Sequence, residues 1–183
     1  MTDSQSFESF MRSYQNMVYT TAYRLLSNHA EAQDIAQEVF LKAYDRYDEI
    51  GGSPRVGGWL KTVTRNLCLN HLTRYRKRWR LFSDFKREGE EDESDYGARL
   101  EDERALAGGS DDSQDQRRIL EAALEGLPDD QRVAIALYHF EEMPYQDIAI
   151  RLKVSLSKVK TDIMRGRQGL KARLAGSREE LGI

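Results

Sequence analysis

Residues 59–80 carry side chains that could recognise unpaired nucleic-acid bases. Six of them fall within about 40° of one line when the segment is drawn as a helix with roughly 100° per residue: Trp59, Thr62, Asn66, Asn70, Thr73 and Lys77. The amides can hydrogen-bond to base edges, and the indole can stack on a base, which contributes roughly 1 to 3 kcal/mol per base. Arg74 and the cations that follow it can hold a phosphate backbone. Trp59 taken alone is slightly better explained as a core aromatic, whereas the whole face favours single-strand binding.

Residues 144–174 have the pattern of a helix-turn-helix. A short helix, a break over 153–156 and a longer helix follow one another, with small Ala149 in the first helix and β-branched Val159 in the second. Two helices that cross steeply need a small residue where they touch and an apolar one to fill the contact. The longer helix has an inward face of Val159, Ile163, Leu170 and Leu174 and an outward face of Lys160, Thr161, Met164, Arg165, Gln168 and Lys171. A cationic outward face favours insertion into the DNA major groove. The alternative is a helical hairpin with a basic, solvated face.

A third surface lies on the helix that we expect after Asn28. Its predicted core stripe is Ile35, Ala36, Val39, Phe40, Ala43, Tyr44 and Tyr47. Its predicted solvent face is polar except for one apolar residue, and consists of Asp34, Gln37, Glu38, Leu41, Lys42 and Asp45. A leucine among acids indicates a contact with a basic protein surface, although a single exposed leucine is also ordinary.

Charge is strongly segregated along the 183-residue chain, although its net charge is only -3. Residues 55–87 hold ten Lys or Arg and one acid, residues 88–116 hold twelve acids and two Arg, and residues 151–178 hold nine Lys or Arg and one acid. Basic blocks of this kind indicate a polyanion partner, and the acidic block indicates a self-repelling linker. Solvated helix faces are the alternative explanation.

Composition excludes several classes of protein. The longest apolar run, over 133–138, has six residues, whereas a membrane span needs about 20. The N-terminus lacks the pattern of a secretory signal, so we expect a cytoplasmic protein without a membrane partner. Cys68 is the single cysteine and the three histidines are widely spaced, so no metal site is expected. We also expect no cofactor, and we expect Cys68 to be buried and inert.

The elements that must position these surfaces are all helical. Apolar periodicity predicts a helix over 4–27, a second one capped by Asn28 with Glu31 as its reciprocal partner, and a third from Trp59. No segment has the alternation of a strand. We therefore predict an all-α fold of two small helical domains, the second with four helices. The predicted boundaries are 1–82 and 116–176 for the domains, 83–115 for an acidic flexible linker that holds them apart, and 177–183 for a tail.

Several of these segments resemble a known family. The residues that carry the resemblance are Asp34 to Tyr44, Gly58-Trp59-Leu60, Asn66 to Leu72, Leu127-Pro128, Pro144 to Ala149 and Val159-Lys160. In their order and spacing they are similar to bacterial extracytoplasmic-function (ECF) sigma factors of RNA polymerase. The resemblance implies a promoter-recognition subunit that is not an enzyme. It covers about residues 7–80 and 117–174, with sigma region two in the first domain and region four in the second.

The resemblance also implies roles for the three surfaces. Asp34, Gln37, Glu38 and Leu41 would dock on the clamp helices of the polymerase's largest subunit. Asn66 and Asn70, with the loop 48–57, would receive a flipped base of the minus-ten promoter element, on a surface that includes Trp59, Arg74 and Lys77. Lys160, Thr161, Met164 and Arg165 would read the minus-thirty-five element as duplex, and the acidic linker would thread a polymerase channel. An anti-sigma factor is an expected further partner.

The sequence departs from the family pattern at the predicted turn. Lys153 and Ser157 stand where glycine is common, and a lysine in the left-handed conformation costs about 1 kcal/mol or more. Asp162 stands where arginine is frequent, which would remove one phosphate contact.

Two other functions are alternatives to promoter recognition. A conventional helix-turn-helix regulator would explain residues 117–174 but would leave the Asn66 and Leu41 surfaces without a role. An enzyme is disfavoured because the sequence has no catalytic triad pattern, phosphate-binding glycine loop or metal-ligand spacing.

Overall fold

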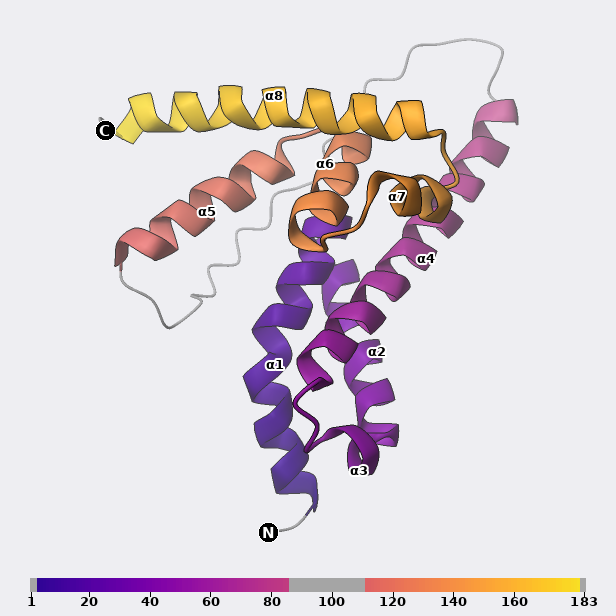
Figure 1. The fold of residues 1–183 in the computed structure, drawn as a ribbon, viewed down its shortest axis with the longest axis vertical. Helices are drawn as coiled ribbons and strands as arrows, with labels where there is room; N and C mark the ends of the chain where they lie inside the picture. Colours follow the sequence, from indigo (N-terminus) through magenta and orange to yellow (C-terminus); the bar gives the residue numbers. More distant parts are fainter. Residues whose placement is uncertain (1–2, 86–110, 182–183) are drawn as a thin grey trace.

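The computed structural model describes residues 3–85 and 111–181, and these residues are mainly helical (Figure 1). The elements are α1 (Asp3–Leu26), α2 (His29–Asp45), α3 (Tyr47–Ile50), α4 (Val56–Phe85), α5 (Asp111–Glu125), α6 (Asp129–Ile135), the π-helical turn η1 (Ala136–Phe140), α7 (Tyr145–Leu152) and α8 (Leu156–Leu181). No strand occurs in these two ranges. The predicted all-α class is therefore confirmed.

Helices α1, α2 and α4 pack side by side as the N-terminal bundle. Val18, Val39 and Leu60 are fully buried between them, and each such side chain stabilises the fold by roughly 1.5 to 3 kcal/mol. The start of α2 is fixed as expected, because the side-chain oxygen of Asn28 accepts a hydrogen bond from the backbone of Glu31 at 3.0 Å. The Glu31 carboxylate lies 3.3 Å from the ring of His71 on α4, which ties α2 to α4.

Helices α5 to α8 form the C-terminal group, in which α8 lies across α6 and beside α5 and α7. Ile148 and Ile163 are fully buried there, and Ala149 and Val159 are buried where α7 and α8 meet, as the sequence predicted. Gly166 allows the close approach of α8 to α6, since a Cβ atom at this position would lie 2.6 Å from Cγ1 of Ile135.

The predicted linker differs from the structure at both ends. Helix α4 continues through residues 83–85, and α5 already includes residues 111–115. Residues 86–110, which make up most of the predicted linker, lie outside the described part of the chain.

The two helical groups are also not held apart as predicted. Helices α5 and α6 and the turn η1 lie against α1, and α7 lies against α4. The expectation from charge repulsion was wrong because cationic side chains of the N-terminal bundle find acidic and carbonyl partners in the C-terminal group. Arg24, for example, pairs with Glu121 at 2.6 Å.

Candidate functional site

The polar face of α2 is fully open to solvent. Asp34, Gln37, Glu38 and Leu41 are all exposed, and Leu41 keeps 67% of its surface. One ion pair on this face joins Glu38 to Lys42 at 3.7 Å. Carboxylates around an apolar side chain form a surface that a basic protein face with an apolar pocket can bind.

Tyr44 corrects the predicted core stripe of α2. Its side chain is 58% exposed, although its ring packs edge-on against Phe7 at 5.0 Å between centroids. Tyr44 therefore adds a second exposed apolar side chain three residues from Leu41. The sequence shows this spacing, but the predicted core stripe assigned Tyr44 to the buried side of the helix.

A groove of about 730 Å³ runs beside this face, between α1 and α2. Its apolar lining residues include Phe7, Met11, Tyr19, Phe40, Leu41 and Tyr44. Since Leu41 belongs to both surfaces, the groove and the acidic face form one continuous area on the N-terminal bundle. Sequence reasoning missed the groove, because its α1 residues belong to a stripe that reads as core.

The amide face of α4 is partly open. Asn70 and Arg74 are exposed, whereas Trp59, Asn66 and Thr73 are partly buried. The Trp59 ring packs against the core, and the guanidinium of Arg46 lies 5.8 Å from its centroid.

The two hydroxyls of this face bond to their own helix. Thr62 donates to the carbonyl of Gly58 at 2.9 Å, and Thr73 donates to that of Leu69 at 2.8 Å. Lys77 belongs to α4, but its side chain lies outside the described residues. Asn70 and Arg74 are therefore the polar groups of this face that are most available to a ligand.

Helix α7 covers part of the same face. The guanidinium of Arg151 donates a hydrogen bond to the side-chain oxygen of Asn66. Beyond this contact a gap of about 460 Å³ separates the helices, lined by Leu69, Asn70, Thr73 and Arg74 of α4 and by Ile150, Arg151 and Lys153 of the C-terminal group. No sequence signal indicated this contact, because the two partners are 85 positions apart.

The outward face of α8 carries the predicted groove-reading residues. Lys160, Met164 and Arg165 are exposed and Thr161 is partly exposed. The turn before α8 is shaped by Lys153, which adopts the left-handed conformation with φ 55° and ψ 45°. The backbone strain expected of a lysine in the left-handed conformation is thus present, because the turn keeps this geometry without a glycine.

The carboxylate of Asp162 is not a free surface charge, because it is paired and mostly buried. Lys158 lies 2.8 Å from Asp162 and 3.0 Å from Asp130, and only 14% of the Asp162 side chain is exposed. The hydrogen bond to Asp162 is the largest cause that raises the pKa of Lys158. The carboxylate is therefore neutralised within α8, and the same lysine links α8 to the start of α6 through Asp130.

Cys68 is buried in the core of the N-terminal bundle with no exposed surface, as expected. Burial, helped by the charge of Glu141, raises the pKa of its thiol to about 12. The group therefore stays protonated and unreactive near neutral pH. Among the described residues, no helix is long and apolar enough to cross a membrane.

Comparison with known proteins matches both helical groups. Residues 10–80 match the model of Sigma-70 region 2, and residues 117–170 match that of Sigma-70 region 4. The chain is 30% identical to the ECF RNA polymerase sigma factor SigW of Bacillus subtilis, over 94% of this chain and 90% of that protein. It is 33% identical to the ECF RNA polymerase sigma factor SigE of Mycolicibacterium smegmatis, over 93% of this chain and 62% of that protein.

A solved structure is also similar. It is the sigma factor RpoE of Bartonella quintana in complex with the anti-sigma factor NepR, with 25% identity and a TM-score of 0.49 over 92% of this chain and 96% of that one.

Proposed function

This chain belongs to the ECF sigma factors of RNA polymerase, and from this premise we propose how its surfaces divide the work of promoter recognition. An alternative sigma factor binds core polymerase and directs transcription initiation. A conventional helix-turn-helix regulator is set aside because the family match includes the N-terminal bundle as well as the C-terminal group. The family is one of transcription factors and not of enzymes.

The α2 face and its groove are proposed as the polymerase-docking surface. Asp34, Gln37 and Glu38 surround Leu41, and all four are exposed on one side of the helix. In the polymerase complex the leucine enters a pocket of the clamp helices on the largest subunit, while the acids pair with basic residues around it. An exposed apolar side chain ringed by complementary charge is the arrangement of an interface hot spot.

The α4 face is proposed to capture a minus-ten base. Asn70 is exposed, and Arg74 lies one helical turn further on, where it can hold a phosphate while the amide bonds to a base edge. Flipping a base costs a few kcal/mol, which these contacts offset. Strand opening and sequence recognition then occur in the same step. Trp59, Asn66 and Lys77 complete this surface once it is free of α7.

The α8 face is proposed to read the minus-thirty-five element as duplex, through Lys160, Thr161, Met164 and Arg165. The observation that supports the whole assignment is that one chain presents an amide-bearing face on α4 and a cationic face on α8, beside an acidic face with an exposed leucine on α2. We propose that the two domains are those predicted as 1–82 and 116–176, with the inner boundaries moved to the end of α4 at Phe85 and to the start of α5 at Asp111. An anti-sigma factor is proposed as the partner that covers the docking face.

Co-purification with core polymerase tests the docking surface. Leu41→Asp should lower the affinity for core polymerase by about thirtyfold, since losing a buried hot-spot side chain costs about 2 kcal/mol. Ala122→Asp is the matched control, because it places the same charge at an exposed position on α5. Equal affinity of the two variants would contradict the docking assignment.

Permanganate probing of a promoter tests the base-capture role. Asn70→Ala should reduce strand opening by the holoenzyme much more than it reduces initial duplex binding. Gln116→Ala, which removes an exposed amide from α5, should leave both unchanged. If the Asn70 variant opened the promoter as well as the unaltered protein, the amide would have no part in capture.

A further inference from the structure

Arg167 is an exposed cation on α8 that does not belong to the residues predicted to read the minus-thirty-five element. At roughly 100° per residue, Arg167 lies within about 60° of Lys160, Met164 and Lys171, so these four residues form one stripe along the helix. All four side chains are exposed. Arg167 therefore continues the side of α8 on which two of the proposed DNA-reading residues lie.

The guanidinium of Arg167 is held by two consecutive residues of η1. Its Nε atom donates a hydrogen bond to Nε2 of His139 at 3.3 Å. The guanidinium carbon also lies 5.4 Å from the centroid of the Tyr138 ring, which is within the range of a cation–π interaction. Within the described ranges, no carboxylate forms an ion pair with Arg167. The cation is therefore held in place without being neutralised.

The imidazole of His139 can accept this hydrogen bond only while its Nε2 atom is unprotonated. Partial burial, helped by the charge of Arg167, lowers the pKa of the ring below its ordinary value of 6.5. The ring is therefore neutral at pH 7 and above, where it serves as an acceptor and does not repel the guanidinium.

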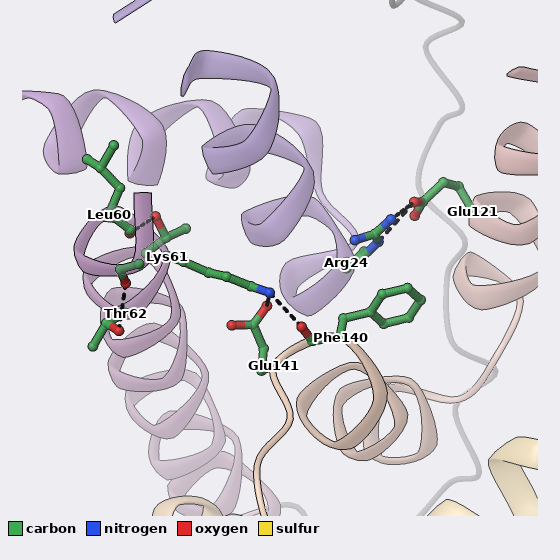
Figure 2. A network of polar contacts seen from close by, with 9 residues as sticks. Arg24, Leu60, Lys61, Thr62, Glu121, Phe140 and Glu141 are labelled. Atoms are coloured by element: carbon green, nitrogen blue, oxygen red, sulfur yellow. Dashed lines mark hydrogen bonds and ion pairs between the residues drawn. The ribbon is translucent and has the colours of Figure 1, made fainter. Parts of the chain in front are cut away.

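The η1 turn that carries these two partners is fixed by packing. Tyr138 is partly buried against the hydrophobic core, and its ring lies 4.8 Å from that of Tyr145 between centroids. Leu137, which precedes it, is fully buried. Figure 2 shows the end of the same turn, where the carbonyl of Phe140 accepts a hydrogen bond from Lys61 at 2.6 Å. The Arg167 guanidinium thus rests on a turn that is itself held on several sides.

Lys158 shows how another cation of α8 differs. Its ammonium lies 3.0 Å from the carboxylate of Asp130 and 2.8 Å from that of Asp162, so two acids compete with any phosphate for it. The partners of Arg167 carry no charge at neutral pH, and leave its attraction for a phosphate intact. An arginine that is already ordered also loses less conformational freedom when it binds.

We propose that Arg167 is a further contact of α8 with duplex DNA, made to a backbone phosphate at the edge of the major groove, and that His139 and Tyr138 are positioning residues that hold its guanidinium ready for this contact. The inference rests on the proposed role of α8 in reading the minus-thirty-five element. Phosphate contacts fix the register of a protein on the duplex without reading its sequence. Arg167 thus orients α8, while the residues already assigned to the element read the bases.

The test measures initial binding of the holoenzyme to a promoter duplex at pH 8, where His139 is unprotonated. The duplex is one that the holoenzyme retains from a random-sequence library. Arg167→Ala should weaken binding about tenfold, as expected for a lost hydrogen bond to a charged group. It should also flatten the plot of log affinity against log salt by about 0.9, the share of one phosphate. Arg118→Ala is the matched control, because it removes an exposed arginine from α5, and it should change neither quantity.

The positioning role of His139 is tested by a double-mutant cycle. His139→Ala should weaken binding about threefold with an unchanged salt slope, because the guanidinium keeps its phosphate but must be ordered when it binds. His139→Gln should restore the affinity, since its amide oxygen can accept the same hydrogen bond. In the Arg167→Ala chain, His139→Ala should cause no further loss. An equal loss in both chains would show that His139 acts on its own and would overturn the positioning role.

Arg165→Ala in the same assay separates this inference from the proposed function. If Arg165→Ala flattens the salt plot and Arg167→Ala does not, α8 binds duplex without Arg167, and only the present inference is overturned. If neither variant changes the slope, or if the holoenzyme retains no duplex from the library, the proposed role of α8 fails and the inference fails with it.

Discussion

Replacement of Lys153 by glycine should stabilise the C-terminal group. Lys153 ends α7 in the left-handed conformation, with φ 55° and ψ 45°, and its backbone N–H bonds to the carbonyl of Ile150 at 3.3 Å. A residue with a side chain loses roughly 1 to 2 kcal/mol in this conformation, which glycine does not. Glycine's greater freedom in the unfolded chain offsets roughly 0.5 to 1 kcal/mol of that gain. The net expectation for Lys153→Gly is about 0.5 to 1 kcal/mol of added stability.

The measurement is thermal denaturation followed by circular dichroism, with the variants compared at one salt concentration. A gain of this size raises Tm by about 1 to 4 °C in a chain of this length. Lys153→Ala is the control that removes the charge and keeps the backbone strain. It should be no more stable than the unaltered chain, because the lysine charge also interacts favourably with the end of α7. Lys153→Asn should lie between the two, since asparagine tolerates this conformation better than alanine does.

The refuting result is a Lys153→Gly variant no more stable than Lys153→Ala. The energy at this turn would then come from charge and not from backbone strain. A gain shared equally by all three variants would have the same meaning, and would point to repulsion between Lys153 and nearby cations such as Arg74, which lines the same gap.

Three further outcomes are expected. Arg165→Ala should flatten the plot of log affinity against log salt for holoenzyme on promoter duplex by about 0.9; an unchanged slope would mean that Arg165 touches no phosphate. Glu141→Gln should stabilise the chain progressively as pH rises above 4.5, the ordinary pKa of the carboxyl. Burial raises this pKa in the folded chain, so the contribution of Glu141 is present in acid and lost at higher pH; denaturation midpoints that shift equally at pH 4 and pH 8 would contradict this. Gly166→Ala should cost about 1 to 3 kcal/mol of unfolding free energy, because its Cβ would lie 2.6 Å from Ile135. Gly176→Ala, with open space around its Cβ, should instead gain up to about 1 kcal/mol, and similar denaturation curves for the two glycine variants would refute the packing argument.

The sign of the Glu141 effect depends on the groups around it. Lys61, Arg65 and Arg24 lower the pKa of this carboxyl, whereas burial raises it and is the larger cause. Cys68 faces the same site, and the Glu141 charge helps to raise the pKa of its thiol.

The sequence by itself determined the local elements, because their signals are carried by neighbouring residues. The cap at Asn28 depends on a residue three positions away, and the buried pair of Ala149 and Val159 depends on the period of two adjacent helices. The exposed faces of α2 and α8 followed from the same periodicity. The motifs of these elements, in their order, were enough to predict the family.

Only the tertiary structure decided how the two groups of helices meet. Arg24 and Glu121 are 97 positions apart, and Lys61 and Phe140 are 79 apart, so no period or motif links them. The acidic block of the linker suggested separation, yet individual cations of the N-terminal bundle pair with acidic and carbonyl groups of the C-terminal group. The exposure of Tyr44 and the pairing of Lys158 with Asp130, 28 positions away, were decided in the same way. Local periodicity tells which side of a helix is covered, but what covers it depends on contacts between residues far apart in the chain.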